Sequence, residues 1–471
     1  MNTSEGKDEL DRTQVKRLRR IFGKQLLLEA ADRWAYGYDN SRQQALPLAV
    51  CLAHSHAQVV DLVRFCVENR IPLIPRGKGT GTTGAVVPAD GGIVLSLEQM
   101  TDTLTIDPDN RLAVVSPGVT NQQLQTAAAE HGFFWPPDPT SAAVCTIGGN
   151  LAYNSAGPRA VKYGTPRENT LALRAVTGTG ETLDTGTRTT KGVVGYDLTR
   201  LLIGSEGTLG IITEAVLKLT PLAAARRTLQ ASYRSIETAS AAVSALMAQP
   251  LTPSTLEFMD GQAIDMVRDY SDLGLPPEAR ALLMIEVDGS ADAIEADARR
   301  VGEVARNAGC LGLELASSDA EVERLWRTRK ALSPALRNIA PKKINEDVAV
   351  PVARLPDLIS GLQALSSRHA IPIVNFGHAG NGNIHVNLLL DPDDPVQASA
   401  AEACLTEVFD LVLALEGTLS GEHGVGRVKR DFVQRELSPV ALRLMQGIKQ
   451  QFDPHNILNP GVGFRAEPPP D

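Results

Sequence analysis

The sequence predicts an α+β fold, in which short strands are mixed with helices and few helices are long. Two observations support this prediction. From residue 229 to residue 316 the apolar patterns follow the order β-α-β-β-α-β, which is the ferredoxin-like unit. The chain of 471 residues also contains 40 Gly and 29 Pro and only 4% aromatic residues, so it must make many tight turns and close backbone approaches.

The first part of the chain is expected to combine helices with short strands. Residues 1–45 form a polar N-terminal helical extension, with a helical pattern at 18–31. From residue 46 the sequence pattern changes and becomes more apolar. Ser55 can cap a helix whose apolar residues recur at the helical period. A buried strand is expected at 71–74. Further strands are expected at 92–97, 104–107, 112–116, 171–177 and 211–219, and a helix at 121–130.

The ferredoxin-like unit occupies the next part of the chain, after Pro221. Its expected elements are a strand at 229–233, a helix at 236–248, strands at 255–259 and 281–287, a helix at 291–308 and a strand at 311–316. A second, weaker copy is indicated from about residue 348 to 415, which would make an internal duplication. Residues 416–471 begin as a Gly-rich loop, continue as a helix and end in a tail punctuated by proline.

Composition excludes several classes of protein. The chain has 46 Lys and Arg against 55 Asp and Glu, and the net charge of −9 argues against nucleic acid as the main ligand. A short basic cluster at 16–20 fits the solvated face of a helix, with a membrane or partner patch as the alternative. The five Cys are scattered and include no CxxC pair, so they support neither an iron–sulfur cluster, a zinc ribbon nor a disulfide framework.

The expected location of the protein is the cytoplasm. The odd, scattered Cys favour a reducing compartment, and the charged start of the chain is not a secretory signal. No stretch approaches the roughly 20 apolar residues of a membrane span. Peripheral docking at the inner face of a membrane is left open by these observations.

A glycine-rich run at residues 75–84 reads Pro-Arg-Gly-Lys-Gly-Thr-Gly-Thr-Thr-Gly. It contains a formal GxGxxG, but residues 85–92 hold a proline and two glycines instead of the helix that a dinucleotide fingerprint needs. The run does not end in Gly-Lys-Ser/Thr, so it is not a P-loop. Its successive backbone N–H groups can instead form a nest that wraps a diphosphate. A flexible surface loop is the alternative.

Two further zones, at 137–158 and 203–213, are rich in Gly, Asn and Ser. With these three zones the sequence resembles the FAD-binding fold of the vanillyl-alcohol-oxidase/PCMH superfamily. It is most similar to the branch of D-lactate dehydrogenase, glycolate oxidase catalytic subunit and D-2-hydroxyglutarate dehydrogenase, over nearly the whole chain after residue 45. The resemblance implies a two-part PCMH-type FAD-binding domain at 46–222, a ferredoxin-like substrate or cap domain at 223–415, and a C-terminal segment at 416–471 that returns to the flavin.

The resemblance also implies a set of contacts to noncovalent FAD, because the glycine run carries no His or Cys. The first zone would hold the diphosphate, the second would line the flavin, and the third would close over the ribityl and adenine side. Lys78 departs from the family, which usually has Gly there, and a cation next to the diphosphate would be favourable. The implied FAD-binding residues are Pro75, Arg76, Gly77, Lys78, Gly79, Thr80, Gly81, Thr82, Thr83, Pro139, Thr140, Ser141, Gly148, Gly149, Asn154, Ser155, Gly157, Glu206, Gly207, Gly210, Ile211, Ile212 and Asn459.

The segment 375–387 reads Asn-Phe-Gly-His-Ala-Gly-Asn-Gly-Asn-Ile-His-Val-Asn and points to a metal. Its Asn-Gly pair at 381–382 is a strong hairpin turn signal. A hairpin centred there places His378 directly opposite His385, close enough for both imidazoles to bind one ion. Asn387 would share their face. The alternative is that both are ordinary loop histidines.

A third ligand is expected from the Gly-flanked loop 420–426, in which Glu422 precedes His423. Two His and one carboxylate suit Zn²⁺, or Mn²⁺ or Fe²⁺, with positions left open for a substrate. The family resemblance implies His378, His385 and Glu422 as metal ligands, His423 as the base for the substrate hydroxyl, and Asn387 as a substrate contact.

A 2-hydroxy acid fits these parts, because it can coordinate a metal and reduce FAD from its α-carbon. Its carboxylate needs a bidentate cation, and Arg329 matches the family's carboxylate-binding Arg. The alternatives are that Arg329 is merely solvated, or that Arg327 or Lys330 takes this role. Lys342 and Lys343 offer a second cation.

We therefore predict FAD-dependent oxidation of a D-2-hydroxy acid, D-lactate first, to the 2-keto acid, with hydride transfer to flavin N5. D-2-hydroxyglutarate and glycolate are the alternative substrates. Electrons would pass to a quinone, a cytochrome, an electron-transfer flavoprotein or an iron–sulfur subunit, and a homodimer is compatible with the chain. Outside this class, a zinc hydrolase leaves the three glycine zones unexplained, and a noncatalytic FAD subunit leaves the His pair unexplained.

Overall fold

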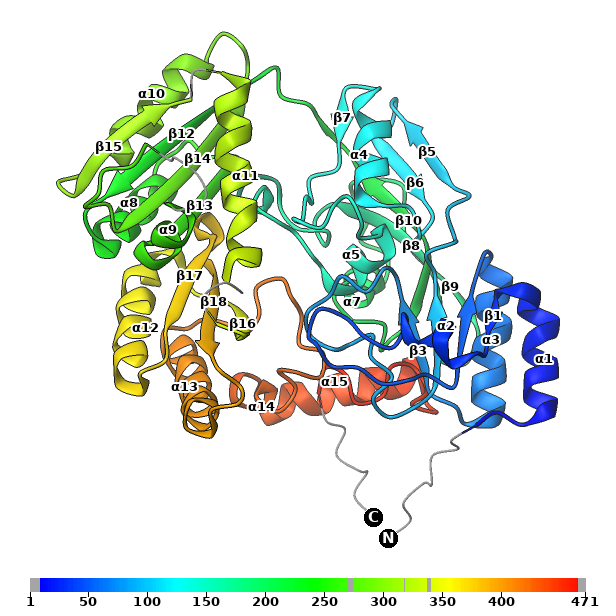
Figure 1. The fold of residues 1–471 in the computed structure, drawn as a ribbon. Helices are drawn as coiled ribbons and strands as arrows, with labels where there is room; N and C mark the ends of the chain where they lie inside the picture. Colours follow the sequence, from blue (N-terminus) through cyan, green and yellow to red (C-terminus); the bar gives the residue numbers. More distant parts are fainter. Residues whose placement is uncertain (1–8, 269–273, 317, 337–339, 465–471) are drawn as a thin grey trace. The chain divides into compact units, whose positions relative to one another are not determined.

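The structure, a computed structural model, describes residues 9–268, 274–316, 318–336 and 340–464. These residues form two compact units (Figure 1). The first unit is drawn from residues 1–156, 164–222 and 422–471, and the second from residues 157–163 and 223–421. The chain thus returns to the first unit for its C-terminal segment.

A four-stranded sheet begins the first unit. Its order is β1 (Leu26–Leu27), β2 (Ala49–Leu52), β4 (Ile93–Ser96) and β3 (Leu73–Arg76). β2 and β3 both pair with β4 in parallel, and β1 pairs with β2 antiparallel. Helix α3 (His56–Asn69) connects β2 to β3. Ser55 Oγ accepts a hydrogen bond from the backbone N–H of Gln58, so the predicted cap is confirmed.

The expected helical pattern at 18–31 is confirmed only at its two ends, because the helix is interrupted after Phe22. Helix α1 spans Arg12–Phe22, where Asp11 opens it with a capping box and Gly23 ends it with φ +55°. A glycine with a positive φ leaves the helical conformation, so the apolar residues after it can extend the sheet as β1. Between β1 and β2 lies the short helix α2 (Ala30–Trp34).

The second sheet of this unit is antiparallel. Its order is β5 (Leu104–Asp107), β6 (Leu112–Val115), β10 (Ile211–Lys218), β8 (Thr170–Val176) and β9 (Thr182–Gly186). The predicted strands are confirmed, and β9 is an addition to them. Trp135 is fully buried in the core between this sheet and its helices. The other elements are α4 (Asn121–Ala129), β7 (Phe133–Phe134), α5 (Ile147–Tyr153), α7 (Leu198–Leu202), β11 (Thr220–Pro221), α14 (Val433–Glu436) and α15 (Pro439–Phe452).

The second unit is built on a seven-stranded antiparallel sheet with the order β15-β12-β14-β13-β17-β18-β16. The first four strands have the ferredoxin-like order, in which the fourth strand of the unit lies beside the first (Figure 1). The predicted elements are confirmed as β12 (Ala225–Tyr233), α8 (Ile236–Ala248), β13 (Thr255–Asp260), β14 (Ala281–Gly289), α10 (Ile294–Ala305) and β15 (Cys310–Leu315). A helix that the sequence patterns did not predict, α9 (Gly261–Arg268), is inserted between β13 and β14.

The other half of this sheet is the second copy of the unit, and in the described part of the chain it has three strands, where the first copy has four. It consists of β16 (Lys342–Ala349), α12 (Leu355–His369), β17 (Ile373–His378), β18 (Asn383–Leu390) and α13 (Pro395–Ala414). Its third strand lies between its first and second, as in the first copy, and the two copies join where β13 pairs with β17. The copy begins at Lys342 and not near residue 348, because the polar residues of β16 hide the apolar alternation of a strand.

Helices cover both faces of this sheet. α8, α10, α12 and α13 contact one another on one face, whereas α9 contacts α11 (Asp319–Ala335) on the other. α9 and α11 enclose an apolar cluster with side chains of β13, β17 and β18. A short helix, α6 (Ala160–Tyr163), packs on β13. Among the residues that the structure describes, none of the helices has the length and apolar content to cross a membrane.

Candidate active site

A pocket in the first unit lies between the end of β3, the start of β10 and helix α5. Ten of the predicted FAD-binding residues line it, from all three glycine-rich zones. These are Pro75, Arg76, Gly77, Gly148, Gly149, Glu206, Gly207, Gly210, Ile211 and Ile212. The pocket is completed by residues that the sequence analysis missed, namely Val86, Leu97, Pro117, Thr146, Ala152, Tyr153 and Ser205. Thr146 had a readable signal, because it caps α5 by accepting a hydrogen bond from Gly149 N–H.

The remaining predicted FAD-binding residues are outside the lining of this pocket. Gly157 belongs to the second unit, and the other twelve belong to the first unit. Their contacts with FAD stay predictions. They are Lys78, Gly79, Thr80, Gly81, Thr82, Thr83, Pro139, Thr140, Ser141, Asn154, Ser155 and Asn459.

The glycine run begins in the last two residues of β3, and residues 85–92 separate it from β4; none of residues 77–92 is helical. None of the backbone N–H groups of residues 77–83 donates a hydrogen bond within the part of the chain that the structure describes. The first N–H after them, that of Gly84, donates to Asp39 at 2.9 Å. Since buried or half-buried N–H groups need acceptors, seven consecutive donors suit a ligand rich in negative oxygen atoms.

Glycine is required at the wall of this pocket because the backbone passes close to other groups. A Cβ on Gly77 would lie 2.5 Å from Thr146 Oγ1, and one on Gly81 would lie 2.8 Å from the hydroxyl of Tyr153. A Cβ on Gly207, whose φ is +72°, would lie 2.7 Å from the Pro75 ring. Real Cβ atoms essentially never make contacts this short, so a larger residue would force the loop or the group that it meets to shift.

Two cations of the run are already bound by the protein. Arg76 is buried and donates to the carbonyl of Tyr38 at 2.7 Å, so it anchors the start of the glycine run to the segment around Tyr38. Burial lowers the pKa of Arg76, while Asp39 opposes that effect. Lys78 forms an ion pair with Glu98 at 2.6 Å. Glu98 also accepts a hydrogen bond from the hydroxyl of Tyr36.

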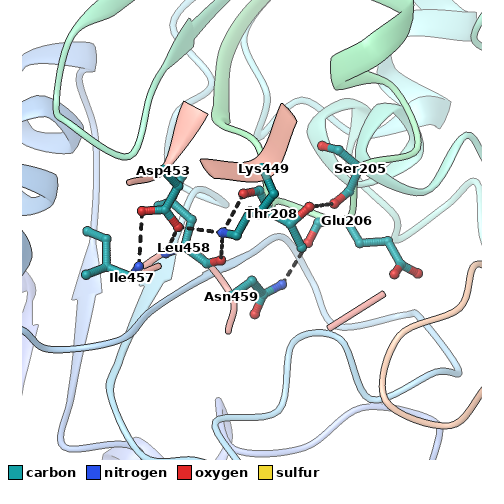
Figure 2. Close-up of polar contacts among 8 residues, drawn as sticks. All are labelled: Ser205, Glu206, Thr208, Lys449, Asp453, Ile457, Leu458 and Asn459. Atoms are coloured by element: carbon teal, nitrogen blue, oxygen red, sulfur yellow. Dashed lines mark hydrogen bonds and ion pairs between the residues drawn. The ribbon is translucent and has the colours of Figure 1, made fainter. Parts of the chain in front are cut away.

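The C-terminal segment fastens the third glycine-rich zone, as Figure 2 shows. Lys449 on α15 donates to the carbonyls of Thr208 and Leu458, both at 2.8 Å, and forms an ion pair with the fully buried Asp453. Asn459 donates through Nδ2 to the carbonyl of Glu206 at 2.7 Å. The turn that carries Ser205, Glu206 and Gly207 into the pocket is therefore held by a segment far away in the sequence.

The side chain of Glu206 holds the loop that follows Glu422. Its carboxylate accepts hydrogen bonds from the N–H groups of Val425 and Gly426, each at 2.9 Å. Burial raises the pKa of Glu206 to about 7, although these two N–H groups and Lys429 oppose that effect. His423 thus belongs to a loop that is bound to the wall of the pocket within the first unit.

The hairpin of β17 and β18 has a different register from the predicted one. His378 lies opposite Asn383, so His385 is its diagonal neighbour and not its direct partner. The connection consists of the 3-10 turn η4 (Ala379–Asn381) and Gly382 at φ +69°. Its centre lies between residues 380 and 381, one residue before the predicted centre between 381 and 382, and this moves each pairing partner by two positions. Because each partner shifts by two positions, the two His still share one face. Their ring centroids are 5.2 Å apart.

A buried carboxylate that the sequence analysis missed joins the His pair to Arg329. Glu257 on β13 lies 2.5 Å from Nδ1 of His378 through Oε1 and accepts from Nε of Arg329 at 2.7 Å through Oε2. The Arg329 guanidinium also stacks over Phe376, 4.8 Å from the ring centroid. Burial by itself raises the pKa of Glu257, but His378 and Arg329 outweigh it and hold the pKa below the usual value.

The exposure of the α11 cations separates Arg329 from its alternatives. The side chain of Arg329 is 10% exposed, whereas that of Arg327 is 74% exposed and pairs with Glu323 in the same helix. The side chain of Lys330 lies outside the described part of the structure. Among the α11 cations whose side chains the structure describes, Arg329 is the one that faces the strands carrying the His pair.

Three residues of β16 and β18 extend this polar face. Asn387 is fully buried, donates to the carbonyls of Val374 and His385, and accepts from Asn345 at 2.6 Å. Its predicted contact with substrate stays a prediction. Because Asn345 lies opposite Asn387, Lys343 shares their face and Lys342 points to the other one.

The loop that carries Glu422 leaves the second unit beside the His pair. Asp347 lies directly opposite His385. The carbonyl of Asp347 accepts from Gly421 N–H at 2.8 Å, and its side chain accepts from Ser420 Oγ at 3.1 Å. Glu422 follows Gly421 by one peptide bond, about 3.8 Å between Cα atoms. It is the first residue of the C-terminal part of the first unit.

Comparison with known proteins extends over almost the whole chain. Residues 47–186 match the model of an FAD binding domain, and residues 222–462 match that of the FAD linked oxidases, C-terminal domain. The chain is 37% identical over 438 residues to glycolate oxidase subunit GlcD of Bacillus subtilis (strain 168), covering 93% of each chain. The chain belongs to the FAD-linked oxidases.

Other members of this family carry the names of two further activities. The chain is 35% identical to a D-lactate dehydrogenase of Archaeoglobus fulgidus, covering 92% of this chain and 96% of that one. It is also 35% identical to a D-2-hydroxyglutarate dehydrogenase of Xanthomonas citri pv. viticola, covering 94% and 95%. This FAD-linked oxidase is therefore an FAD-dependent oxidoreductase of the type formed by these three groups.

The fold of the family agrees with the predicted one. A structure of p-cresol methylhydroxylase with substrate bound superposes with a TM-score of 0.78 over 96% of each chain, at 18% identity. That likeness concerns the fold alone. Together with the two family models, it confirms the prediction of a PCMH-type FAD-binding domain joined to an α+β domain.

The residues of the first unit fit FAD. The seven backbone N–H groups at 77–83 suit its diphosphate, and the apolar lining with close glycines leaves room for a flat ring system. Asn459 Oδ1 is buried and has no hydrogen-bond partner among the described residues, so an acceptor is left next to the pocket wall. The oxidoreductase family and this pocket therefore agree on the cofactor.

Proposed function

We propose that this FAD-linked oxidase converts a D-2-hydroxy acid, with D-lactate as the first candidate, to the corresponding 2-keto acid. The proposal is carried by one observation, the polar face of the second unit on which a His pair lies beside a buried carboxylate and arginine. Imidazoles suit a metal and a guanidinium suits a carboxylate, and a 2-hydroxy acid offers a ligand to both. The names of the relatives agree, because glycolate, D-lactate and D-2-hydroxyglutarate are all 2-hydroxy carboxylates.

Arg329 would bind the carboxylate of the substrate. Its Nε–H is used by Glu257, which fixes the plane of the guanidinium. The edge formed by the two terminal nitrogen atoms matches a carboxylate in a bidentate manner. The Phe376 ring below the guanidinium limits its rotation. Lys343 lies on the same face and would favour a substrate with a second carboxylate, such as D-2-hydroxyglutarate.

His378 and His385 would bind a metal together with Glu422. Two imidazoles and a carboxylate form a donor set for Zn²⁺, or for Mn²⁺ or Fe²⁺. Glu422 is included because Gly421, next to it, is bonded to the residue opposite His385. When bound, the metal would lower the pKa of the substrate hydroxyl and FAD would accept the hydride at N5.

His423 would take the proton of the substrate hydroxyl as a neutral imidazole. It follows Glu422 directly, so the base would lie next to a metal ligand. The two hydrogen bonds from Val425 and Gly426 to Glu206 restrain the loop just behind it. A restrained base is what hydride transfer needs, since the proton and the hydride leave the same substrate molecule.

The experiment that tests this function is anaerobic mixing of the yellow protein with a panel of hydroxy acids. The panel contains D-lactate, L-lactate, glycolate and D-2-hydroxyglutarate, and bleaching of the flavin absorbance is followed. We expect D-lactate to bleach the flavin and L-lactate to leave it oxidised. A flavin that none of the four acids reduces would overturn the proposal.

Reduced FAD must then be reoxidised. We propose a quinone, a cytochrome, an electron-transfer flavoprotein or an iron–sulfur subunit as the acceptor, because none of the five Cys forms a CxxC pair that could hold a cluster in this chain. Air-driven reoxidation with peroxide formation is the alternative. Peroxide measured during turnover, against the rate with an artificial quinone, decides between the two.

A further inference from the structure

Glu257 occupies the middle of the polar face and touches both functional groups on it. We infer that Glu257 is a positioning residue, which sets the orientation of His378 toward the metal and of Arg329 toward the substrate carboxylate. This inference rests on the proposed function. It goes beyond that function, because it links the two binding sites through one side chain that neither the family resemblance nor the glycine zones indicate.

The contacts of Glu257 are divided between its two oxygen atoms. Oε1 is 2.5 Å from Nδ1 of His378, and Oε2 accepts from Nε of Arg329 at 2.7 Å. The side chain of Glu257 is 1% exposed, so water cannot replace either partner. These partners come from β17 and α11, 121 and 72 residues away along the chain. Each oxygen atom therefore has its own task.

The bond to His378 selects one tautomer of the imidazole. A carboxylate next to a guanidinium only accepts hydrogen bonds, so Nδ1 of His378 must carry the hydrogen. The lone pair of the neutral ring then resides on Nε2, which is the ring atom that would bind a metal. A carboxylate in this place also fixes the ring plane and raises the basicity of the ligand.

The bond to Arg329 works in the same way on the other side. Glu257 uses the Nε–H and leaves the edge of the two terminal nitrogen atoms for the substrate. The face of Phe376 lies 4.8 Å from the guanidinium carbon and limits the remaining rotation. A change at Glu257 should therefore disturb metal binding and substrate binding together, which a residue with a purely structural role would not do.

The matched control is Glu286 on the neighbouring strand β14. It is also buried, at 5% exposure, and its carboxylate accepts from the hydroxyl of Thr228. Glu286→Gln makes the same chemical change in the same sheet. It lacks the bonds to His378 and Arg329, so it reports the cost of the substitution by itself.

The test titrates the full-length, FAD-loaded and metal-depleted protein with Zn²⁺ in competition with a chromophoric chelator. Glu257→Gln should weaken the affinity for Zn²⁺ about 10- to 100-fold, because an amide offers one acceptor where two donors need one each. Glu286→Gln should keep the affinity of the unaltered protein. The KM for D-lactate should rise in Glu257→Gln as well, through Arg329.

The outcomes separate this inference from the proposed function. A yellow Glu257→Gln protein with unaltered Zn²⁺ affinity overturns the inference and leaves the metal site in place. If a His378→Ala protein binds Zn²⁺ as tightly as the unaltered protein, the metal site is overturned, and the inference with it. If Glu257→Gln fails to hold FAD, Glu257→Asp is titrated instead. It should bind Zn²⁺ more weakly than the unaltered protein, and equal affinity overturns the inference.

Discussion

Replacing Lys449 by Met should unfasten the C-terminal segment from the FAD pocket. Lys449 joins three partners at once, the carbonyls of Thr208 and Leu458 and the carboxylate of Asp453 (Figure 2). Burial lowers the pKa of Lys449, whereas Asp453 opposes that effect. The methionine stem fills nearly the same space, so the change removes the charge and the three bonds and leaves the packing.

The magnitude follows from burial. The side chain of Asp453 is 0% exposed and that of Lys449 is 15% exposed, so the lost cation leaves a buried charge without its partner. Breaking a buried pair from one side costs about 3–5 kcal/mol, which includes the unmatched charge. For a unit of this size that corresponds to a fall in melting temperature of about 6–20 °C. Because Ser205 and Gly207 line the pocket, FAD should also be released at a lower temperature.

The assay is thermal release of FAD, followed by the rise of flavin fluorescence, with unfolding followed in parallel by circular dichroism. Arg200→Met is the control, since Arg200 pairs with Asp197 at an exposed site of the same unit, and losing that pair should lower the free energy of unfolding by less than about 1 kcal/mol. If the temperature at which Lys449→Met releases FAD is within about 2 °C of that of the unaltered protein, the reasoning is refuted.

Four further predictions address the site. His423→Ala should stay yellow while the rate of flavin reduction by D-lactate falls at least about 100-fold, measured by anaerobic stopped flow; an unchanged rate rejects the assigned role. Chelation should abolish the same reduction and added Zn²⁺ or Mn²⁺ should restore it, whereas chelator-resistant activity speaks against a metal. Glu206 has a raised pKa of about 7, so the folded state holds a proton that the unfolded state releases near 4.5, and stability should decline as pH rises from about 4.5 to 7. Glu206→Gln should flatten that part of the urea-unfolding profile, and an equal slope in both proteins contradicts the assignment. Gly77→Ala should lower FAD retention, because its Cβ would lie 2.5 Å from Thr146 Oγ1. Gly447→Ala, with open space around its Cβ, should be neutral. Similar FAD contents in both variants would contradict the role of Gly77 in the pocket wall.

Local patterns predicted much of the fold. The Ser55 cap, the strands of the second sheet and the ferredoxin-like order were readable because capping and apolar periodicity act over a few residues. The helix at 18–31 was not, since Gly23 stops α1 and the leucines after it pair with a strand. Strand pairing is a contact between distant segments, which periodicity alone does not reveal.

The site divides in the same manner. The sequence predicted that His378 and His385 share one face, and this holds for any connection with an even number of residues, because side chains alternate between the two faces of a strand. It also determined a glycine loop without a following helix. The register of that hairpin, with a four-residue connection, was decided by the turn conformation in the folded chain.

Only the tertiary structure decided which charges meet. Glu257 looks like any strand residue in the sequence, and its partners lie 72 and 121 residues away. The choice of Arg329 over Arg327 depended on burial by the sheet, and the choice of Lys343 over Lys342 depended on pairing with β18. Such contacts arise because burial forces a carboxylate to find donors, and the donors within reach are set by how the strands pack and not by the order of residues along the chain.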